Sequence, residues 1–282
     1  MIQQPWLKEI VIIDDHSTDG SWEILTKIQK ENPDLVRIFS NPTKGGNNAR
    51  NYGFEQATGK YIQWLDADDT LLPGKLEAQV MALESNLECE IAYSDWRIDR
   101  YECHQLVASE EKFKLYTNDY LLELIKDNWC APNNYLIKRS MAIKLANGFG
   151  WNPNTKVAQD REYFTKAGIL GAQFLYVPGT YSVYNKWGDH TVSGISYLER
   201  SIKCYDLSLE YKRLIQVSSL ALDKKKKYIK VLNAQALRTK FYHPKIEIRV
   251  DFSFNMVDWK EIHWKIRALL FFYLILKMIK IF

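Results

Sequence analysis

The sequence predicts an α/β protein with a doubly wound, mainly parallel sheet flanked by helices, followed by a helical C-terminal appendage. Short β-branched runs alternate with amphipathic segments through the first hundred residues, and such an order produces parallel strands joined by right-handed crossovers. Two of the predicted strands end in acidic residues, at the sheet edge where proteins of this class bind ligands. The two acidic segments are therefore expected to meet in one cleft.

Strands are predicted where continuous apolar runs indicate burial on both faces. These runs cover residues 9–13, 35–39, 60–65, 91–94 and 134–138. Helices are predicted where apolar residues recur at helical spacing between turn residues. They cover residues 20–32, 47–57, 73–85, 116–126 and 159–170, and the pattern is helical throughout beyond about residue 196.

Charge divides the chain into two parts. Residues 1–200 carry 21 basic and 27 acidic side chains, whereas residues 201–282 carry 17 and 7. We therefore expect an acidic binding domain over 1–195 and a basic helical region over 196–282, which indicates contact with an anionic partner.

The four cysteines include no CxxC pair, which argues against a zinc site or a disulfide framework and fits a reducing cytosol. No signal peptide and no apolar run of the roughly 20 residues that a membrane span needs are visible.

Three carboxylates fall within four residues at the end of one predicted strand, at Asp66, Asp68 and Asp69. Because like charges repel and a buried carboxylate is costly, this pattern predicts a bound cation. Oxygen ligands favour Mg²⁺ or Mn²⁺. Such an ion bridges the two phosphates of a nucleotide-diphosphate and neutralises the leaving group. The alternative is a solvated acidic turn.

Two further segments offer groups for a nucleotide. Asp14 and Asp15 end the first predicted strand, where a carboxylate can accept hydrogen bonds from a uracil ring or a ribose, although both residues also suit a simple turn. The glycine-rich segment 41–53 leaves backbone amides free for anions beside a helix N-terminus. Within it, Lys44 and Arg50 are candidates for contact with phosphate or base, and the alternative is a plain connection.

A candidate general base lies about ninety residues beyond the acidic segment. A reaction in which a hydroxyl attacks the group joined to the diphosphate needs a general base that takes the proton of that hydroxyl. Asp160 opens a predicted helix and is placed to reach the cleft. A helix N-cap is the more common role for an aspartate at such a position.

Taken together, these segments resemble glycosyltransferase family 2, whose members have the GT-A type fold. Family members carry a strand that ends in Val-Asp-Asp-Gly-Ser-Thr-Asp, which corresponds here to residues 13–19. They also carry Asn-x-Gly…Ala-Arg-Asn-x-Gly and Gly-x-Tyr-Ile-x-x-Leu-Asp-x-Asp-Asp-x-x-x-Pro, which correspond to residues 41–53 and 59–73. An acidic pair opens a later helix in the family, where this chain has Gln159-Asp160. The resemblance covers about residues 1–190.

The resemblance implies an inverting transfer of a sugar from a nucleotide-diphosphate donor to a glycan or lipid-linked acceptor, in the synthesis of bacterial-type surface polysaccharide or glycolipid. It implies Asp160 as the general base. A divalent cation, Mn²⁺ or Mg²⁺, is expected at Asp68 and Asp69, with His190 as a further candidate ligand. The expected donor contacts are Asp14, Asp15, Lys44, Arg50, Asp66 and Asp68.

The chain departs from the family pattern at three places. His16 replaces the usual glycine, and Gln159 replaces the usual glutamate. The family's first strand and helix, about 30 residues, have no counterpart before residue 9. We therefore expect the strand at 10–13 to lack one sheet neighbour and to expose an unpaired edge.

The basic C-terminal region suggests a location at the inner face of the plasma membrane. Residues 262–282 are apolar and aromatic with flanking cations, and a four-lysine run occupies 224–227. This pattern suits peripheral contact with an anionic surface, and no nucleic-acid partner is expected. The alternative is a terminal helix packed on the body of the protein.

Two other functions remain open from the sequence. Loss of the first strand would leave an inactive nucleotide-sugar binder. The segment 66–70 also fits Asp-x-Asp-x-Thr of haloacid-dehalogenase-type phosphatases, in which Asp66 would be the nucleophile and Asp68 the acid/base. That motif normally lies on the first strand of its domain, whereas here two strands precede it.

Overall fold

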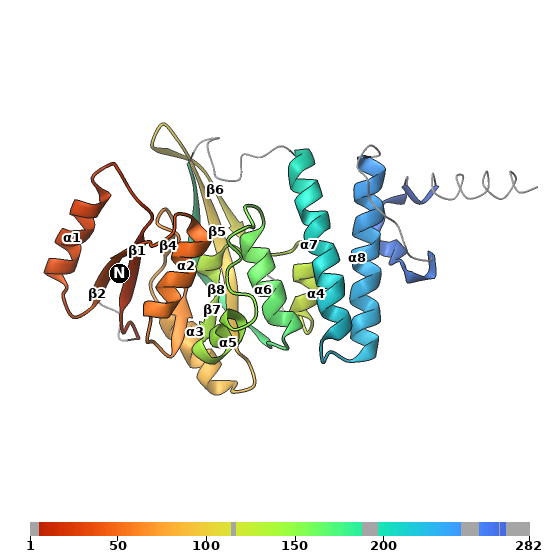
Figure 1. Cartoon of the computed structure of the whole chain (residues 1–282), viewed down its shortest axis with the longest axis horizontal. Helices are drawn as coiled ribbons and strands as arrows, with labels where there is room; N and C mark the ends of the chain where they lie inside the picture. Colours follow the sequence, from red (N-terminus) through yellow and green to blue (C-terminus); the bar gives the residue numbers. More distant parts are fainter. Residues whose placement is uncertain (1–5, 114–116, 188–196, 244–253, 265, 269–282) are drawn as a thin grey trace, which may run out of the picture. The chain divides into compact units, whose positions relative to one another are not determined.

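A computed structural model describes residues 6–113, 117–187, 197–243, 254–264 and 266–268. The chain divides into two compact units (Figure 1). The first comprises Met1–Tyr120 and Asn128–Gly194, and the second comprises Leu121–Asp127 and Ile195–Phe282. The acidic segments and the predicted general base all belong to the first unit.

The strands of the first unit form two sheets. In the smaller sheet, β1 (Ile10–Asp14) runs parallel to β2 (Val36–Ser40), and α1 (Ser21–Glu31) connects them. The larger sheet has six strands in the order β3-β7-β5-β8-β4, with β6 paired to β5. Its strands are β3 (Tyr61–Gln63), β4 (Thr70–Leu71), β5 (Ile91–Glu102), β6 (Gln105–Lys112), β7 (Leu136–Lys138) and β8 (Phe174–Trp187).

The predicted α/β class is confirmed, and the strand pairing differs from the prediction. The sequence predicted one mainly parallel sheet, whereas the larger sheet is mixed. In it β5 runs parallel to β8, and the pairs β3·β7, β5·β7, β4·β8 and β5·β6 are antiparallel. The sequence prediction lacked β4, β6 and β8, and their polar alternation gives a weaker local signal than a continuous apolar run.

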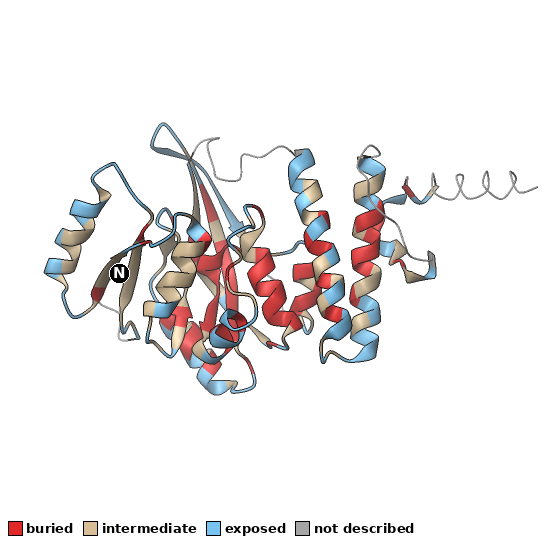
Figure 2. Ribbon diagram, viewed as in Figure 1, coloured by how far each residue is buried: buried red, intermediate tan, exposed pale blue. Residues whose placement is uncertain are grey.

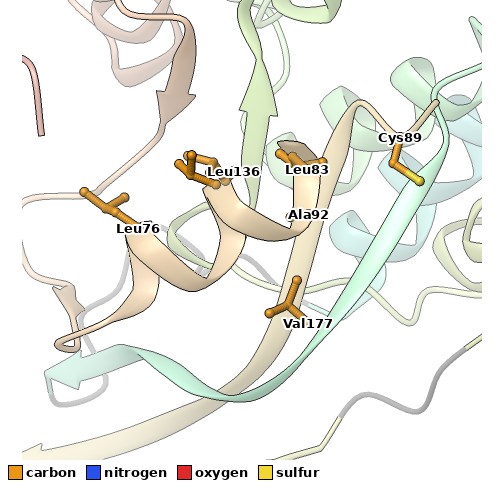
Figure 3. Packing of buried hydrophobic residues seen from close by; sticks show 7 residues of the cluster. Leu76, Leu83, Cys89, Ala92, Leu136 and Val177 are labelled. Carbon is orange, nitrogen blue, oxygen red and sulfur yellow. The ribbon is translucent and has the colours of Figure 1, made fainter. Parts of the chain in front are cut away.

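One core cluster of the first unit lies between α3 (Lys75–Ser85) and the larger sheet (Figure 3). Leu76, Val80 and Leu83 of α3 pack with residues of β5, β7 and β8, and Leu83 is fully buried. The remaining helices of this unit are α2 (Gly46–Gln56), α5 (Arg139–Ala146) and α6 (Gln159–Ile169), and α4 (Tyr120–Ile125) begins at its edge. Helices α2, α3 and α6 lie within a residue or two of their predicted positions, because helical periodicity is local. The α4 helix begins four residues after its predicted start, and α5 was not predicted.

Burial differs sharply between two helices of the first unit (Figure 2). Every residue of α6 from Arg161 to Ile169 is buried, whereas α1 has no buried residue. A helix enclosed on all sides is held by many contacts, and a helix with one open face is held by few. The start of α6, where Asp160 lies, is therefore firmly positioned.

The edge of β1 opposite β2 has no strand partner within the described residues, as the sequence predicted. Side-chain bonds from Glu9 tie this small sheet to the connection that precedes β3. Its Oε1 accepts hydrogen bonds from the backbone amides of Thr58 (2.5 Å) and Gly59 (2.9 Å), and its Oε2 pairs with Arg37 at 3.1 Å. The α2 helix also lies close to β1, because a Cβ atom on Gly53 would stand 3.2 Å from Ile13.

The second unit is helical over the residues that the structure describes. It contains α7 (Tyr197–Val217), α8 (Leu222–Tyr242) and two short turns, Phe254–Met256 and Trp259–Glu261. Ala234 and Leu237 of α8 pack against Val257, Ile262 and Ile266. Among the described helices, none has the length and apolar character needed to cross a bilayer. Most of the terminal helix predicted over 262–282 lies outside the described residues.

Candidate functional site

The acidic segment 66–69 forms a turn that β8 holds in place. The Asp69 amide donates to the Asp66 carbonyl at 3.1 Å, which closes the turn. The Asn185 amide donates to Asp69 Oδ1 at 3.0 Å, and the Asn185 side chain donates to the Asp68 carbonyl at 2.7 Å. Asp69 is 8% exposed, and its Oδ2 has no hydrogen-bond partner in the described part of the chain. An open carboxylate oxygen therefore remains at a buried position.

Arg50 joins the acidic segment to the start of α6. Its Nη2 pairs with Asp66 Oδ1 at 2.6 Å, and its Nη1 donates to Gln159 Oε1 at 3.1 Å. The guanidinium carbon lies 4.7 Å from the centre of the Trp151 ring, a stacked arrangement that favours a planar cation. Gln159 takes the place of the family's glutamate, and its neutral amide oxygen serves as the acceptor.

The segment before α6 is clamped to α2 by two asparagines. Asn47 donates to the Asn152 carbonyl at 2.6 Å, and Asn51 bonds both the amide and the carbonyl of Trp151 at 2.8 and 2.7 Å. These two residues and Arg50 lie on one face of α2, because they stand three and four positions apart. Gly150 has φ +58, and a Cβ atom there would lie 3.0 Å from Asn51, so this close approach requires glycine.

Asp160 is the second residue of α6, and Ala158 occupies the N-cap position. The N-cap alternative for Asp160 is therefore not what the structure shows. Loss of solvent raises the pKa of Asp160 to about 7, while Arg50 lowers it and Asp66 raises it further. A carboxylate with a pKa near 7 exchanges protons readily at neutral pH, as a general base must.

The acidic segment shows the same electrostatic strain. Burial raises the pKa of Asp69 to about 8; the Asn185 amide opposes this rise, while Asp68, Asp66 and Asp160 add to it. Partial burial and Asp66 also raise the pKa of Asp68. These carboxylates therefore lie close enough to destabilise one another's charged forms.

The loop before α2 is built around Asp15. Its Oδ1 accepts from the Asn41 side chain at 2.6 Å and from the Gly45 amide at 2.8 Å. Gly45 has φ +129, which favours glycine, and Gly46 starts α2 directly after it. Asp14 accepts from the Ser17 amide at 3.2 Å, and Lys44 is exposed beside the loop.

The structure brings several predicted site residues together through α2. Asp15 bonds Gly45 immediately before its first turn, and Arg50 at the end of that turn reaches Asp66 and Gln159. His190 lies outside the described residues. His16 has φ +63, the left-handed conformation that explains why glycine is common there in the family.

Sequence reasoning missed the residues that hold the site. Asn47, Asn51 and Asn185 are polar residues in helix or strand positions with no distinctive spacing, although the first two fall within the motif at 41–53. Among the described side chains, no three His, Cys, Asp or Glu residues converge into a ready-made metal centre.

A model of the family described as Glycosyl transferase family 2 matches residues 2–145, about half of the chain. YibD of Escherichia coli K12, an uncharacterised glycosyltransferase, is 44% identical over 98 residues, which are 34% of this chain and 28% of that protein. An uncharacterised glycosyltransferase of Haemophilus influenzae is 40% identical over 140 residues, 49% of this chain and 52% of the relative.

A third relative, from E. coli, is WfaP, named as UDP-Glc:alpha-D-GlcNAc-diphosphoundecaprenol beta-1,3-glucosyltransferase. It is 36% identical over 92 residues, 33% of this chain and 36% of that protein. The chain spans about a quarter to about half of the length of these three relatives.

Among solved structures, S. aureus TarS 1-349 in complex with UDP-GlcNAc matches with a TM-score of 0.65 at 15% identity. The match covers 88% of this chain and 69% of that chain. At such low identity the likeness concerns the fold alone, and it confirms the GT-A type fold that the sequence predicted.

The raised pKa values predict that the cation-free protein loses stability as pH rises. Asp69 and Asp160 bind their protons more tightly in the folded than in the unfolded chain, so their contribution is complete below about pH 4 and is lost up to about pH 8. We expect Asp69→Asn to raise the free energy of unfolding at pH 8.5 by at least about 1.4 kcal/mol, the equivalent of one pKa unit.

Urea denaturation in chelating buffer at pH 5.5, 7 and 8.5 measures this effect. Asp34→Asn, at an exposed position, is the control and should leave the pH dependence as in the wild type. The same pH dependence in Asp69→Asn and wild type would contradict the assignment.

Proposed function

The chain belongs to glycosyl transferase family 2, and we propose that it transfers a sugar from a nucleotide-diphosphate donor to an acceptor hydroxyl with inversion at the anomeric carbon. The observation that carries this proposal is that Arg50 bonds both Asp66 of the acidic segment and Gln159, the residue directly before Asp160. Through Arg50, the proposed proton acceptor is thus linked to the acidic segment, which suits a cation and a diphosphate. The family match favours this activity over the phosphatase alternative.

In the proposed reaction, Asp160 accepts the proton of the acceptor hydroxyl as the oxygen attacks the anomeric carbon. The bond from that carbon to the diphosphate breaks, and the nucleotide-diphosphate leaves with the bonding electrons. The proton ends on Asp160, whose pKa of about 7 suits this exchange. Attack from the side opposite the leaving group inverts the configuration.

The donor contacts proposed here follow the first turn of α2. The amides that begin this helix favour an anion, and Lys44 adds a positive charge nearby. Asp14 and Asp15 are proposed to face the base and ribose, and Arg50 to lie beside the diphosphate while it holds Asp66. Because WfaP is named for a UDP-glucose reaction and TarS was crystallised with UDP-GlcNAc, UDP-sugars are the first donors to test.

Asp68 and Asp69 fit a divalent cation. Asp69 Oδ2 is buried without a hydrogen-bond partner among the described residues, and the neighbouring carboxylates raise the pKa of Asp69. An oxygen-only donor set suits Mg²⁺ or Mn²⁺, with donor phosphates as further ligands. When bound, the cation would neutralise charge on the leaving diphosphate.

We also propose a glycan or lipid-linked acceptor and peripheral contact with the inner face of the plasma membrane. The donor class and the named lipid-linked acceptor of WfaP support the first part. The exposed lysines at the start of α8 and the exposed Trp264 support the second, because cations and interfacial aromatic rings favour anionic membrane surfaces.

Removal of the proposed base tests the mechanism. Asp160→Asn should lower kcat by about 10²–10⁴ and leave UDP affinity within twofold, whereas Asp160→Glu should retain part of the activity. The wild-type kcat/KM should rise with pH through a midpoint above an ordinary aspartate pKa and at or below about 7, since a bound cation favours the charged form. The rate of UDP release from UDP-glucose or UDP-GlcNAc, with and without an acceptor glycoside, gives kcat and the pH dependence of kcat/KM.

Asp34→Asn should behave as wild type in the same assay. Tight UDP binding without any turnover by the wild type would instead support the inactive binder.

Chelation tests the cation. Calorimetric titration with UDP should give at least tenfold weaker binding in chelator than with Mn²⁺, because the ion offsets repulsion between phosphate and carboxylate. Asp69→Asn and Asp68→Asn should lose most of this difference. Equal UDP affinity with and without Mn²⁺ in the wild type would reject a cation between these aspartates and the diphosphate.

Vesicle flotation tests the membrane contact. The full chain should float with vesicles containing phosphatidylserine and remain below with pure phosphatidylcholine. Lys224→Gln with Lys226→Gln should weaken the binding, at about 1 kcal/mol per lysine. Equal flotation with both vesicle types would show that the lysines of α8 do not bind the vesicles by electrostatic attraction to anionic lipid.

A further inference from the structure

The end of β8 lies directly against the acidic segment. Val183 pairs with Thr70 in the β4·β8 ladder, and the next residue but one, Asn185, bonds Asp69 and Asp68. Tyr184 stands between these two contacts. The backbone of Tyr184 is therefore held at the edge of the site by the contacts of its two neighbours.

The surroundings of Tyr184 are aromatic on one side and charged on the other. Its ring centre lies 6.1 Å from that of Trp96 at an angle of 54°, and the Lys186 ammonium lies 5.9 Å from the Tyr184 ring. Trp96 is 8% exposed, and its indole N–H has no hydrogen-bond partner among the described residues. Tyr184 itself is partly exposed. The Tyr184 ring is thus partly open, and the buried Trp96 ring packs near it.

The Tyr184 hydroxyl also lies within the field of the site. Partial burial raises its pKa, and four carboxylates raise it further, in the order Asp69, Asp68, Asp160 and Asp66. The phenol therefore stays protonated at neutral pH and can donate a hydrogen bond. Within the part of the chain that is described, no hydrogen bond to this hydroxyl is present, so its donor is open to a ligand.

We propose that Tyr184, supported by Trp96, is the platform on which the acceptor's sugar ring packs, with the Tyr184 hydroxyl donating to an acceptor oxygen. This inference rests on the proposed glycosyl transfer. A pyranose ring has an apolar face of C–H bonds, and the negative face of an aromatic ring attracts such groups. A neutral polar ligand with one apolar face is the chemical class that fits both features.

The acceptor fits this platform better than the donor sugar does. The donor carries a diphosphate and a base, for which charged groups and helix amides are already present along α2 and the acidic segment. The sugar ring of an acceptor is itself neutral, even where a lipid diphosphate is attached to it. The ring gains little from those charged groups, so it needs apolar contact to hold it beside Asp160. The residue after Tyr184 bonds Asp69 through its backbone amide, and Asp69 and Asp160 both raise the pKa of the Tyr184 hydroxyl. Tyr184 therefore lies near the acidic segment and within the field of the proposed base.

The test compares two tyrosines of the same strand pair. Tyr184→Ala and Tyr184→Phe are the test variants, and Tyr101→Ala is the control. Tyr101 stacks on Trp187 at 4.2 Å, and Trp187 lies three residues beyond Tyr184, so strand alternation puts the two rings on opposite faces of β8. The probes are octyl glycosides of glucose, galactose and N-acetylglucosamine, with UDP-glucose and UDP-GlcNAc as donors.

We expect Tyr184→Ala to raise the KM for the accepted glycoside at least about fivefold and Tyr184→Phe about two- to threefold, with donor KM within twofold of wild type. Tyr101→Ala should leave both constants unchanged. A raised donor KM with an unchanged acceptor KM would overturn the proposal. So would a fall in kcat alone, which indicates a purely structural role.

Saturation-transfer NMR with the same glycosides separates this proposal from the proposed function. If the wild type binds a glycoside and Tyr184→Ala weakens that binding, the platform is supported even when no sugar is transferred. The absence of sugar transfer would count against the proposed transferase activity and not against the platform. Turnover that proceeds normally with Tyr184→Ala would leave the transferase standing and reject the platform.

Discussion

Repulsion among carboxylates is the constraint on which this site depends. Asp69 and Asp160 both have pKa values shifted to near neutrality by burial and by neighbouring acids. The fold tolerates this arrangement because Arg50 compensates one side of the cluster and the Asn185 amide compensates the other. Neither partner neutralises the cluster completely, and Asp69 keeps a buried oxygen without a bond in the described structure. Repulsion among these carboxylates lowers the stability of the ligand-free protein. A ligand that reduces the repulsion therefore binds more tightly.

The α2 helix is the element through which the parts of the site are connected. Its N-terminal side is shaped by Asp15, and its inner face carries the two asparagines and the arginine that hold the segment before α6. This short helix can contribute to both parts of the site. The backbone amides of its first turn favour an anion, while its side chains contact the segment before α6 and the acidic segment. The burial of α6 from Arg161 to Ile169 then holds the turn on which Asp160 lies. Substitutions on this face of α2 should therefore affect the proposed general base, Asp160, and the proposed donor contacts together.

The smaller sheet is only partly enclosed. It has two strands, an open edge among the described residues and a helix with no buried residue. Three bonds to Glu9 Oε1 and the contact between Gly53 and Ile13 link it to the rest. His16 adds strain, since a left-handed backbone costs a non-glycine residue roughly 1–2 kcal/mol. Because this sheet carries Asp14 and Asp15, the proposed contacts to the base are expected to be the most adaptable of the site.

The sequence alone determined the elements with strong local signals. The strands ending at Asp14 and before Asp66, and the helices α1, α2, α3 and α6, follow from apolar periodicity, and the ordered motifs led to the family and to Asp160. Tertiary structure alone decided the mixed pairing of the larger sheet, the bridge from Arg50 to both Asp66 and Gln159, and the arrival of Tyr184 and Asn185 beside Asp69. The physical reason is range: helix formation depends on residues three or four positions apart, whereas a strand such as β8 pairs with β4 more than a hundred residues earlier, and nothing in its own spacing records that partner.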